Sequence, residues 1–168
     1  SRGVQQWVAR YNAPRNLPDR AEALEVDRFG NIYVTGSAFH TSSGTDANIT
    51  TIKYNAEGRE QWVVRGPGTF YGDRVVLAAD GLGNLYVAGR GRRSSTSADF
   101  VTIKYSSTGT PLWTAWYNGP ANSTDAAQGI AVDGSGNVFV TGFSRGQTTF
   151  YDAVTIKYNA NGVEQWVA

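Results

Sequence analysis

The chain has 168 residues, of which 40% are hydrophobic, with no Cys and a formal net charge of +1. This composition is typical of a folded globular protein, and the lack of Cys excludes disulfides, thiolate metal sites and Cys nucleophiles. The near-neutral charge disfavours nucleic acid and anionic membranes as partners. Apolar runs of about five residues are far shorter than the roughly 20 that a membrane-spanning helix needs.

Short strands are predicted along the first part of the chain. Residues 1–12, in which Trp7 follows Gly3 by four positions, predict one strand. Four more follow, rich in β-branched and aromatic residues and separated by Gly, Asn and Asp: Ala23–Asp27, Asn31–Ser37, Ile49–Asn55 and Glu60–Arg65. No stretch has a helical period, so we expect an all-β chain.

The same pattern recurs twice more along the chain. The segment that begins at Asp27 and reads DRFGNIYVTG returns at Asp80 and Asp133, each time after 53 residues. The segment Thr-Ile-Lys-Tyr also occurs three times, and Gly is followed four residues later by Trp at Gly3, Gly58, Gly109 and Gly162. A repeat of this period is one supersecondary unit that buries its apolar faces by stacking on neighbours.

These three motifs, in this order, resemble a bacterial β-propeller repeat family of the SBBP type, with the signature D-x-x-G-N-x-Y-V-T-G, T-I-K-Y and Q-W. Ala88 and Leu112 are small departures from it. The resemblance covers nearly the whole chain and implies three four-stranded propeller blades, at residues 19–66, 73–118 and 125–168. Residues 1–12 would be the outer strand of a preceding or neighbouring blade. The family also implies a bacterial protein that is extracellular or at the cell surface.

The Lys and Asp residues keep fixed positions in the repeat. Each third strand carries one Lys: Lys53, Lys104 and Lys157. The Asp residues form three sets, before the first strand (Asp19, Asp73, Asp125), in the first turn (Asp27, Asp80, Asp133) and in the long loop (Asp46, Asp99, Asp152). Because a buried Lys is costly unless paired, we expect each Lys to pair with a loop Asp and each turn Asp to cap its own turn.

A structural Ca²⁺ held by Asp near the propeller axis is an alternative for these carboxylates, since Ca²⁺ prefers oxygen ligands. No Asp-x-Asp-x-Asp loop supports it, and we expect no cofactor. His40, the single His, is expected to be a solvated loop residue. The pairs Glu22/Glu25 and Glu57/Glu60 have no counterparts in the other repeats, so we expect no enzyme.

Two further groups of residues are interpreted through the repeat. Four Trp residues occupy equivalent positions and predict packing between blades: Trp7, Trp62, Trp113 and Trp166. Trp116 has no such counterpart. Together with the only basic cluster, Arg90, Arg92 and Arg93, it is a candidate for a face that binds a glycan or a protein.

The two ends of the chain carry nearly the same segment, GVQQWVA from Gly3 and GVEQWVA from Gly162. Three blades do not close a propeller, which needs about four to eight, so we expect copies of the chain to associate. Two chains would form a six-bladed ring, or a contact that does not close would form a filament. The candidate assembly strand contains Val4, Trp7, Val8, Arg10 and Tyr11.

The sequence therefore predicts a non-enzymatic extracellular structural protein that self-assembles by strand and blade complementation. The alternative is a glycan- or protein-binding propeller that is a fragment of a larger secreted repeat protein.

Overall fold

The structure is a computed structural model that describes residues 3–39, 47–66, 69–92 and 97–168, without the side chains of residues 69–74. In these ranges the secondary structure consists of strands and turns. No helix among the described residues is long and apolar enough to cross a membrane.

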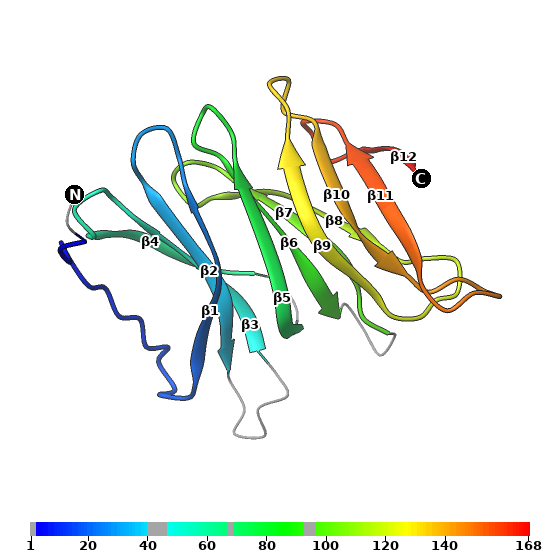
Figure 1. Ribbon diagram of the computed structural model, residues 1–168, viewed down its shortest axis with the longest axis horizontal. Coiled ribbons are helices and arrows are strands. Elements are labelled where there is room, and N and C mark those ends of the chain that lie inside the picture. Colours follow the sequence, from blue (N-terminus) through cyan, green and yellow to red (C-terminus); the bar gives the residue numbers. More distant parts are fainter. Residues whose placement is uncertain (1–2, 40–46, 67–68, 93–96) are drawn as a thin grey trace.

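Twelve antiparallel strands form three four-stranded sheets that stand side by side like the blades of an open fan (Figure 1). Blade 1 contains β1 (Asp19–Val26), β2 (Ile32–Phe39), β3 (Ala47–Tyr54) and β4 (Glu60–Arg65). Blade 2 contains β5 (Thr69–Ala79), β6 (Leu85–Arg92), β7 (Asp99–Tyr105) and β8 (Pro111–Tyr117). Blade 3 contains β9 (Asp125–Val132), β10 (Val138–Ser144), β11 (Asp152–Tyr158) and β12 (Glu164–Val167).

Within each blade, consecutive strands pair in the order of the chain, and a single pair, Ala47 with Phe70, joins blade 1 to blade 2. The first strands of the blades, β1, β5 and β9, contact one another in turn. The register places the Lys of each third strand opposite the Trp of the fourth strand: Lys53 with Trp62, Lys104 with Trp113 and Lys157 with Trp166.

The predicted fold class, propeller blades of four strands, is confirmed. In blade 1 the strand bounds differ from the predicted ones by only a few residues, and β4 agrees at both ends. The segment before β1 differs from the prediction, because no strand is assigned to residues 3–18. A strand requires a neighbouring strand for its backbone hydrogen bonds, and within the described residues none lies beside this segment.

The hydrophobic core consists of two layers between the blades. The layer between blades 1 and 2 contains Tyr33, Leu85 and Val87, and the layer between blades 2 and 3 contains Tyr86 and Ala88. Because side chains alternate along a strand, successive residues of β6 enter opposite layers. The apolar residues of each blade are therefore buried by the blades beside it.

Candidate functional site

The turn Asp residues hold the first turn of every blade. The Oδ1 atom of Asp27 accepts hydrogen bonds from the backbone N–H groups of Phe29 and Asn31, both at 2.9 Å, and its Oδ2 accepts one from the Asn31 side chain. Asp80 and Asp133 accept the equivalent bonds in blades 2 and 3. These carboxylates are therefore committed to their own turns.

These hydrogen bonds set the ionisation of the turn carboxylates. Burial acts to raise the pKa of Asp27 and of Asp80, but the hydrogen bonds from the turn outweigh it, so both pKa values lie below the ordinary Asp value. The pKa of Asp133 is also lowered, mainly by the side-chain bond from Asn137. The folded blades therefore favour the charged form of all three groups.

The strand Lys and the fourth-strand Trp of one blade donate to one carbonyl of the next blade. Lys53 Nζ and Trp62 Nε1 donate to the carbonyl oxygen of Ser107 at 3.0 and 3.1 Å. Lys104 Nζ and Trp113 Nε1 donate to that of Ala160 at 3.3 and 3.1 Å. We call the Lys and Trp the donor pair and the carbonyl the acceptor carbonyl, and the three together a latch.

A glycine beside each acceptor carbonyl makes room for the indole ring. Gly109 and Gly162 have φ values of 84° and 77°, in the region that favours glycine. A Cβ atom at Gly109 would lie 2.9 Å from the ring of Trp62, and one at Gly162 would lie 2.6 Å from the ring of Trp113. The two residues of the Gly-x-x-x-Trp motif therefore have different roles. The Gly makes room for the Trp of the preceding blade, and the Trp packs on the following blade.

The structure corrects the expected pairing of each strand Lys with a loop Asp. Lys104 bonds to the next blade, whereas Asp99 lies five residues before it at the other end of β7. An odd separation places two strand residues on opposite faces, and five residues span about 16 Å, so the two side chains do not meet. The same spacing separates Asp152 from Lys157. Asp46, the expected partner of Lys53, lies outside the described residues.

Asp19 and Asp125 hold the segments that lead into blades 1 and 3. Asp19 accepts a hydrogen bond from the N–H of Ala13 at 2.8 Å, and Asp125 accepts one from the N–H of Gly119 at 2.7 Å. Asp99 is buried; this burial, with the nearby charge of Asp125, raises its pKa. Asp152 accepts a hydrogen bond from the Thr149 hydroxyl, and the side chain of Asp73 lies outside the described part of the chain.

A tyrosine hydroxyl adds a further bond between blades 1 and 2. Tyr33 donates to Asp27 at 3.0 Å and lies 3.1 Å from the carbonyl oxygen of Gly83 in the first turn of blade 2. Tyr86 makes the equivalent bond to Asp80 in blade 2. In blade 3 this position is Phe139, which has no hydroxyl group.

The acceptor carbonyl of blade 1 accepts a hydrogen bond from a Trp but from no Lys among the described residues. The Ala56 carbonyl oxygen accepts a hydrogen bond from Trp7 Nε1 at 3.2 Å, and within the described residues no Lys occupies the second place. Gly58, with a φ of 75°, receives the Trp7 ring as Gly109 receives Trp62. The same half of the latch is therefore present, but its Trp comes from residues 3–12.

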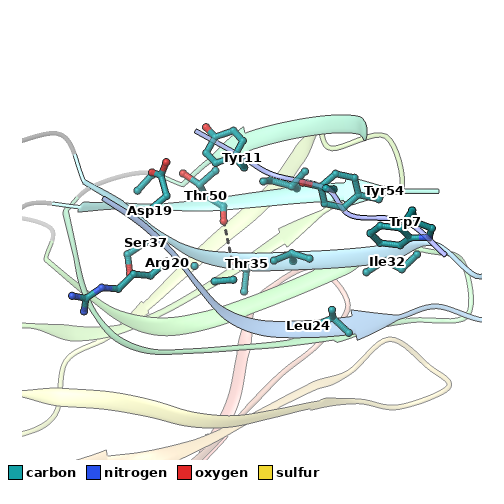
Figure 2. A pocket seen from close by; sticks show the side chains of 16 residues that line it. Trp7, Tyr11, Asp19, Arg20, Leu24, Ile32, Thr35, Ser37, Thr50 and Tyr54 are labelled. Carbon is teal, nitrogen blue, oxygen red and sulfur yellow. Dashed lines mark hydrogen bonds between the residues drawn. The ribbon is translucent and has the colours of Figure 1, made fainter. Parts of the chain in front are cut away.

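The outer face of blade 1 contains an apolar cavity of about 260 Å³ beneath residues 3–12. Figure 2 shows the lining residues Trp7 and Tyr11 on the segment before β1, Leu24 on β1 and Ile32 on β2. Leu24 is 62% exposed and Ile32 is half-buried, whereas their equivalents in blade 2, Leu77 and Leu85, are half-buried and fully buried. This cavity therefore occupies the space that a preceding blade fills at the two inner faces.

Blade 3 has a donor pair without an acceptor carbonyl among the described residues. Lys157 lies 5.4 Å from the centre of the Phe139 ring, and Trp166, which is 43% exposed, lies 6.2 Å from the same ring. Lys53 and Trp62 have the same arrangement around Tyr33. The donor pair of blade 3 is therefore already in the arrangement of a latch.

The candidate ligand face is only partly described. Arg93 and His40 lie outside the described residues, and Arg90 and Arg92 are on β6. The Trp116 ring packs on the hydrophobic core and would lie 3.1 Å from a Cβ atom at Gly91. Trp116 is thus partly buried and does not present an open aromatic surface to a glycan.

The described residues contain no group of three or more His, Asp or Glu side chains that would hold a metal ion. Glu57 and Glu60 are exposed, and Glu22 accepts a hydrogen bond from the Ser37 hydroxyl. The latch carbonyls were not found by sequence reasoning, because a backbone acceptor in the next blade leaves no side-chain signal. The odd Asp–Lys spacing was a usable sign that the pairing within a blade was wrong.

Comparison with known protein families gives one match, at residues 113–146, to a family described as a β-propeller repeat and abbreviated SBBP. This span begins at the latch residue Trp113 and continues through β9 and β10. A comparison with curated proteins gives no match. Residues 113–146 therefore match the SBBP β-propeller repeat, which confirms the predicted resemblance.

Proposed function

We propose that the chain is a non-enzymatic structural protein whose three-blade copies assemble with one another, blade 3 of one copy against blade 1 of the next. The observation that carries this proposal is the pair of unmatched latch halves. Blade 3 has a donor pair, Lys157 and Trp166, and blade 1 has an acceptor carbonyl at Ala56 that is still open to a Lys. At the two inner junctions the Lys of one blade donates to the acceptor carbonyl of the next blade, and the same contact would join blade 3 of one copy to blade 1 of another.

The apolar surfaces support the same arrangement. Leu24 and Val26 on blade 1 and Trp166 and Val167 on blade 3 are all substantially exposed. Burial of apolar surface contributes about 25 cal/mol per Å², and contiguous exposed apolar faces commonly mark association sites. Docking blade 3 on blade 1 would cover both faces at once.

Such a contact joins two different surfaces, so it is heterologous and either closes into a ring or propagates as a filament. Two copies would give six blades, which lies within the usual range of propellers. An extracellular or cell-surface location follows from the family resemblance, and copies of the same chain are the partners. The repeated Lys, Trp and Asp residues of the blades then serve cohesion, with no cofactor and no catalytic group.

The test compares Lys157→Ala with Arg145→Ala. Both remove one positive charge from blade 3, but Arg145 is exposed at the far end of β10, away from the latch. A charge-assisted hydrogen bond contributes about 1.5–3 kcal/mol, so Lys157→Ala should weaken assembly by at least about tenfold. Light scattering over a concentration series measures this, and electron microscopy separates rings from filaments. Equal assembly of the two variants would reject the latch as the contact.

A further inference from the structure

Residues 3–12 lie on blade 1 along the path that the outer strand of a preceding blade follows at the two inner junctions. The Trp7 ring lies 6.3 Å from the Tyr54 ring, and the Trp113 ring lies 6.2 Å from the equivalent Tyr158 ring. The Trp7 Nε1 bond to Ala56 is 3.2 Å long, against 3.1 Å for Trp113 to Ala160. Trp7 is thus placed on blade 1 as Trp113 is placed on blade 3.

The connection that follows Trp7 is also built like the connection between blades 2 and 3. The Asn12 side chain donates to that of Asn16 at 2.8 Å, as Asn118 does to Asn122. Asn16 and Asn122 have φ values of 52° and 47°, in the left-handed region that Asn tolerates. Together with the bonds of Asp19 and Asp125, these contacts hold residues 3–12 on the outer-strand path.

This segment nevertheless has no strand beside it among the described residues. Residues 3–8 and Arg10 are exposed, and they form no strand. An extended edge with unpaired N–H and C=O groups is a template for pairing with another chain. Residues 3–12 therefore lie where an outer strand would lie, but they have no strand to pair with among the described residues.

We propose that β11 of a second copy pairs with residues 3–12 and releases its own β12. The inference rests on the proposed function and names the contact through which it occurs. By the register of β7 with β8, Trp7 would lie opposite Lys157 of the second copy, and Arg10 opposite Val154 of the second copy. Blade 3 of one copy is then completed by the first strand of the next.

The occupancy of blade 1 by Trp7 favours this exchange. The Trp7 ring fills the space at Gly58 that Trp166 of a second copy would need, so both Trp residues cannot be placed there together. With Trp7 in place, Lys157 of the second copy reaches the Ala56 carbonyl and completes the latch. Residues 3–9 can replace residues 162–168 with nearly the same side chains, because the two segments differ only at Gln5 and Glu164.

The strand that is released is weakly held. β12 spans Glu164–Val167, and all four of its residues are exposed. Its contacts with β11 run from Tyr158 to Thr155, whereas β8 pairs with β7 along Phe100 to Tyr105. Residues 3–12 include the equivalents of Trp116 and Tyr117, Arg10 and Tyr11, which in blade 2 pair with Val101 and Phe100.

The test is a disulfide between Arg10→Cys and Val154→Cys in the full chain, which has no Cys of its own. Arg10 precedes β1 of blade 1 and Val154 lies on β11 of blade 3, with blade 2 between them (Figure 1), so a disulfide within one chain is excluded. The control combines Arg10→Cys with Gly134→Cys, an exposed position in the first turn of blade 3 with nothing within 4 Å of an added Cβ.

Under mild oxidation we expect covalent dimers and higher species from the first pair and far fewer from the control. Assembly measured by light scattering without this cross-link would overturn the strand exchange and leave the proposed function standing. No assembly at all would overturn both. If the Val154 variant fails to fold, Trp7→Ala and Trp166→Ala decide the question. Strand exchange predicts at least tenfold weaker assembly for Trp7→Ala and little change for Trp166→Ala, and the reverse result overturns it.

Discussion

Blades 2 and 3 carry the same repeat but differ in the burial of their third strands. Every residue of β7 in blade 2 is buried, whereas in β11 of blade 3 buried and more exposed residues alternate after two exposed ones. The two strands share the sequence V-T-I-K-Y. The difference therefore comes from the neighbours, since blade 2 has a blade on each side and blade 3 has one. Blades 1 and 3 therefore each have one face that no blade covers among the described residues.

The same comparison holds for the polar contacts. At the inner junctions, the Ser107 and Ala160 carbonyls each accept both members of a donor pair. At the outer faces, the donors are on blade 3 and the acceptor is on blade 1. Polar groups that need a partner when buried are thus distributed so that one outer face complements the other.

The largest expected effect separates an inner from an outer Trp. Trp113→Ala removes a packed indole and its hydrogen bond, and should lower the free energy of unfolding by about 3 kcal/mol. Trp166→Ala, measured on the monomer at low concentration, should cost less than about 1 kcal/mol because this side chain is 43% exposed and is not packed against a following blade. Urea unfolding measures both, with Leu112→Ala, at a 52% exposed neighbour, as the control. Equal losses for the two Trp variants would contradict the comparison.

A smaller effect is expected at the position where blade 3 departs from the other blades. Phe139→Tyr restores the hydroxyl that Tyr33 uses to bond Asp27 and the Gly83 carbonyl of the next blade. A hydrogen bond contributes about 1 kcal/mol net, so assembly should tighten about fivefold. Phe150→Tyr, at an 83% exposed loop residue, is the control. Weaker assembly of the Phe139 variant would mean that this ring does not face a turn of another copy.

The smallest expected effect is the acid dependence of the first turns. The pKa of Asp80 is lower in the folded chain than its ordinary value of about 4, so its contribution is complete above that pH. The contribution is lost as pH falls from about 4 through the lower folded pKa, because the unfolded chain binds the proton first. Asp80→Asn should therefore flatten the fall in unfolding free energy over this range. Asp133→Asn should flatten it less, because Asp133 is not bonded to a Tyr hydroxyl. An unchanged acid slope in Asp80→Asn would contradict this.

Much of the fold could be predicted from the sequence, because the repeat shows the strand order three times and the turns carry Gly, Asn and Asp. The positions of Trp62 and Trp113 between blades also follow from their repetition. The partners of Lys53 and Lys104 could not be predicted, since a backbone carbonyl gives no side-chain pattern. The placement of Trp7 on blade 1 likewise depends on three-dimensional neighbours, although the near-identity of the two terminal segments indicated that they share a role.

The most direct test of the account is sedimentation of the unmodified chain over a wide range of concentrations. Complementary outer faces predict a mass that rises with concentration from one chain to two for a ring, or without limit for a filament. A single species with the mass of one chain at every concentration would contradict the account, because Lys157 of blade 3 and the open carbonyl of blade 1 would then have no affinity for each other.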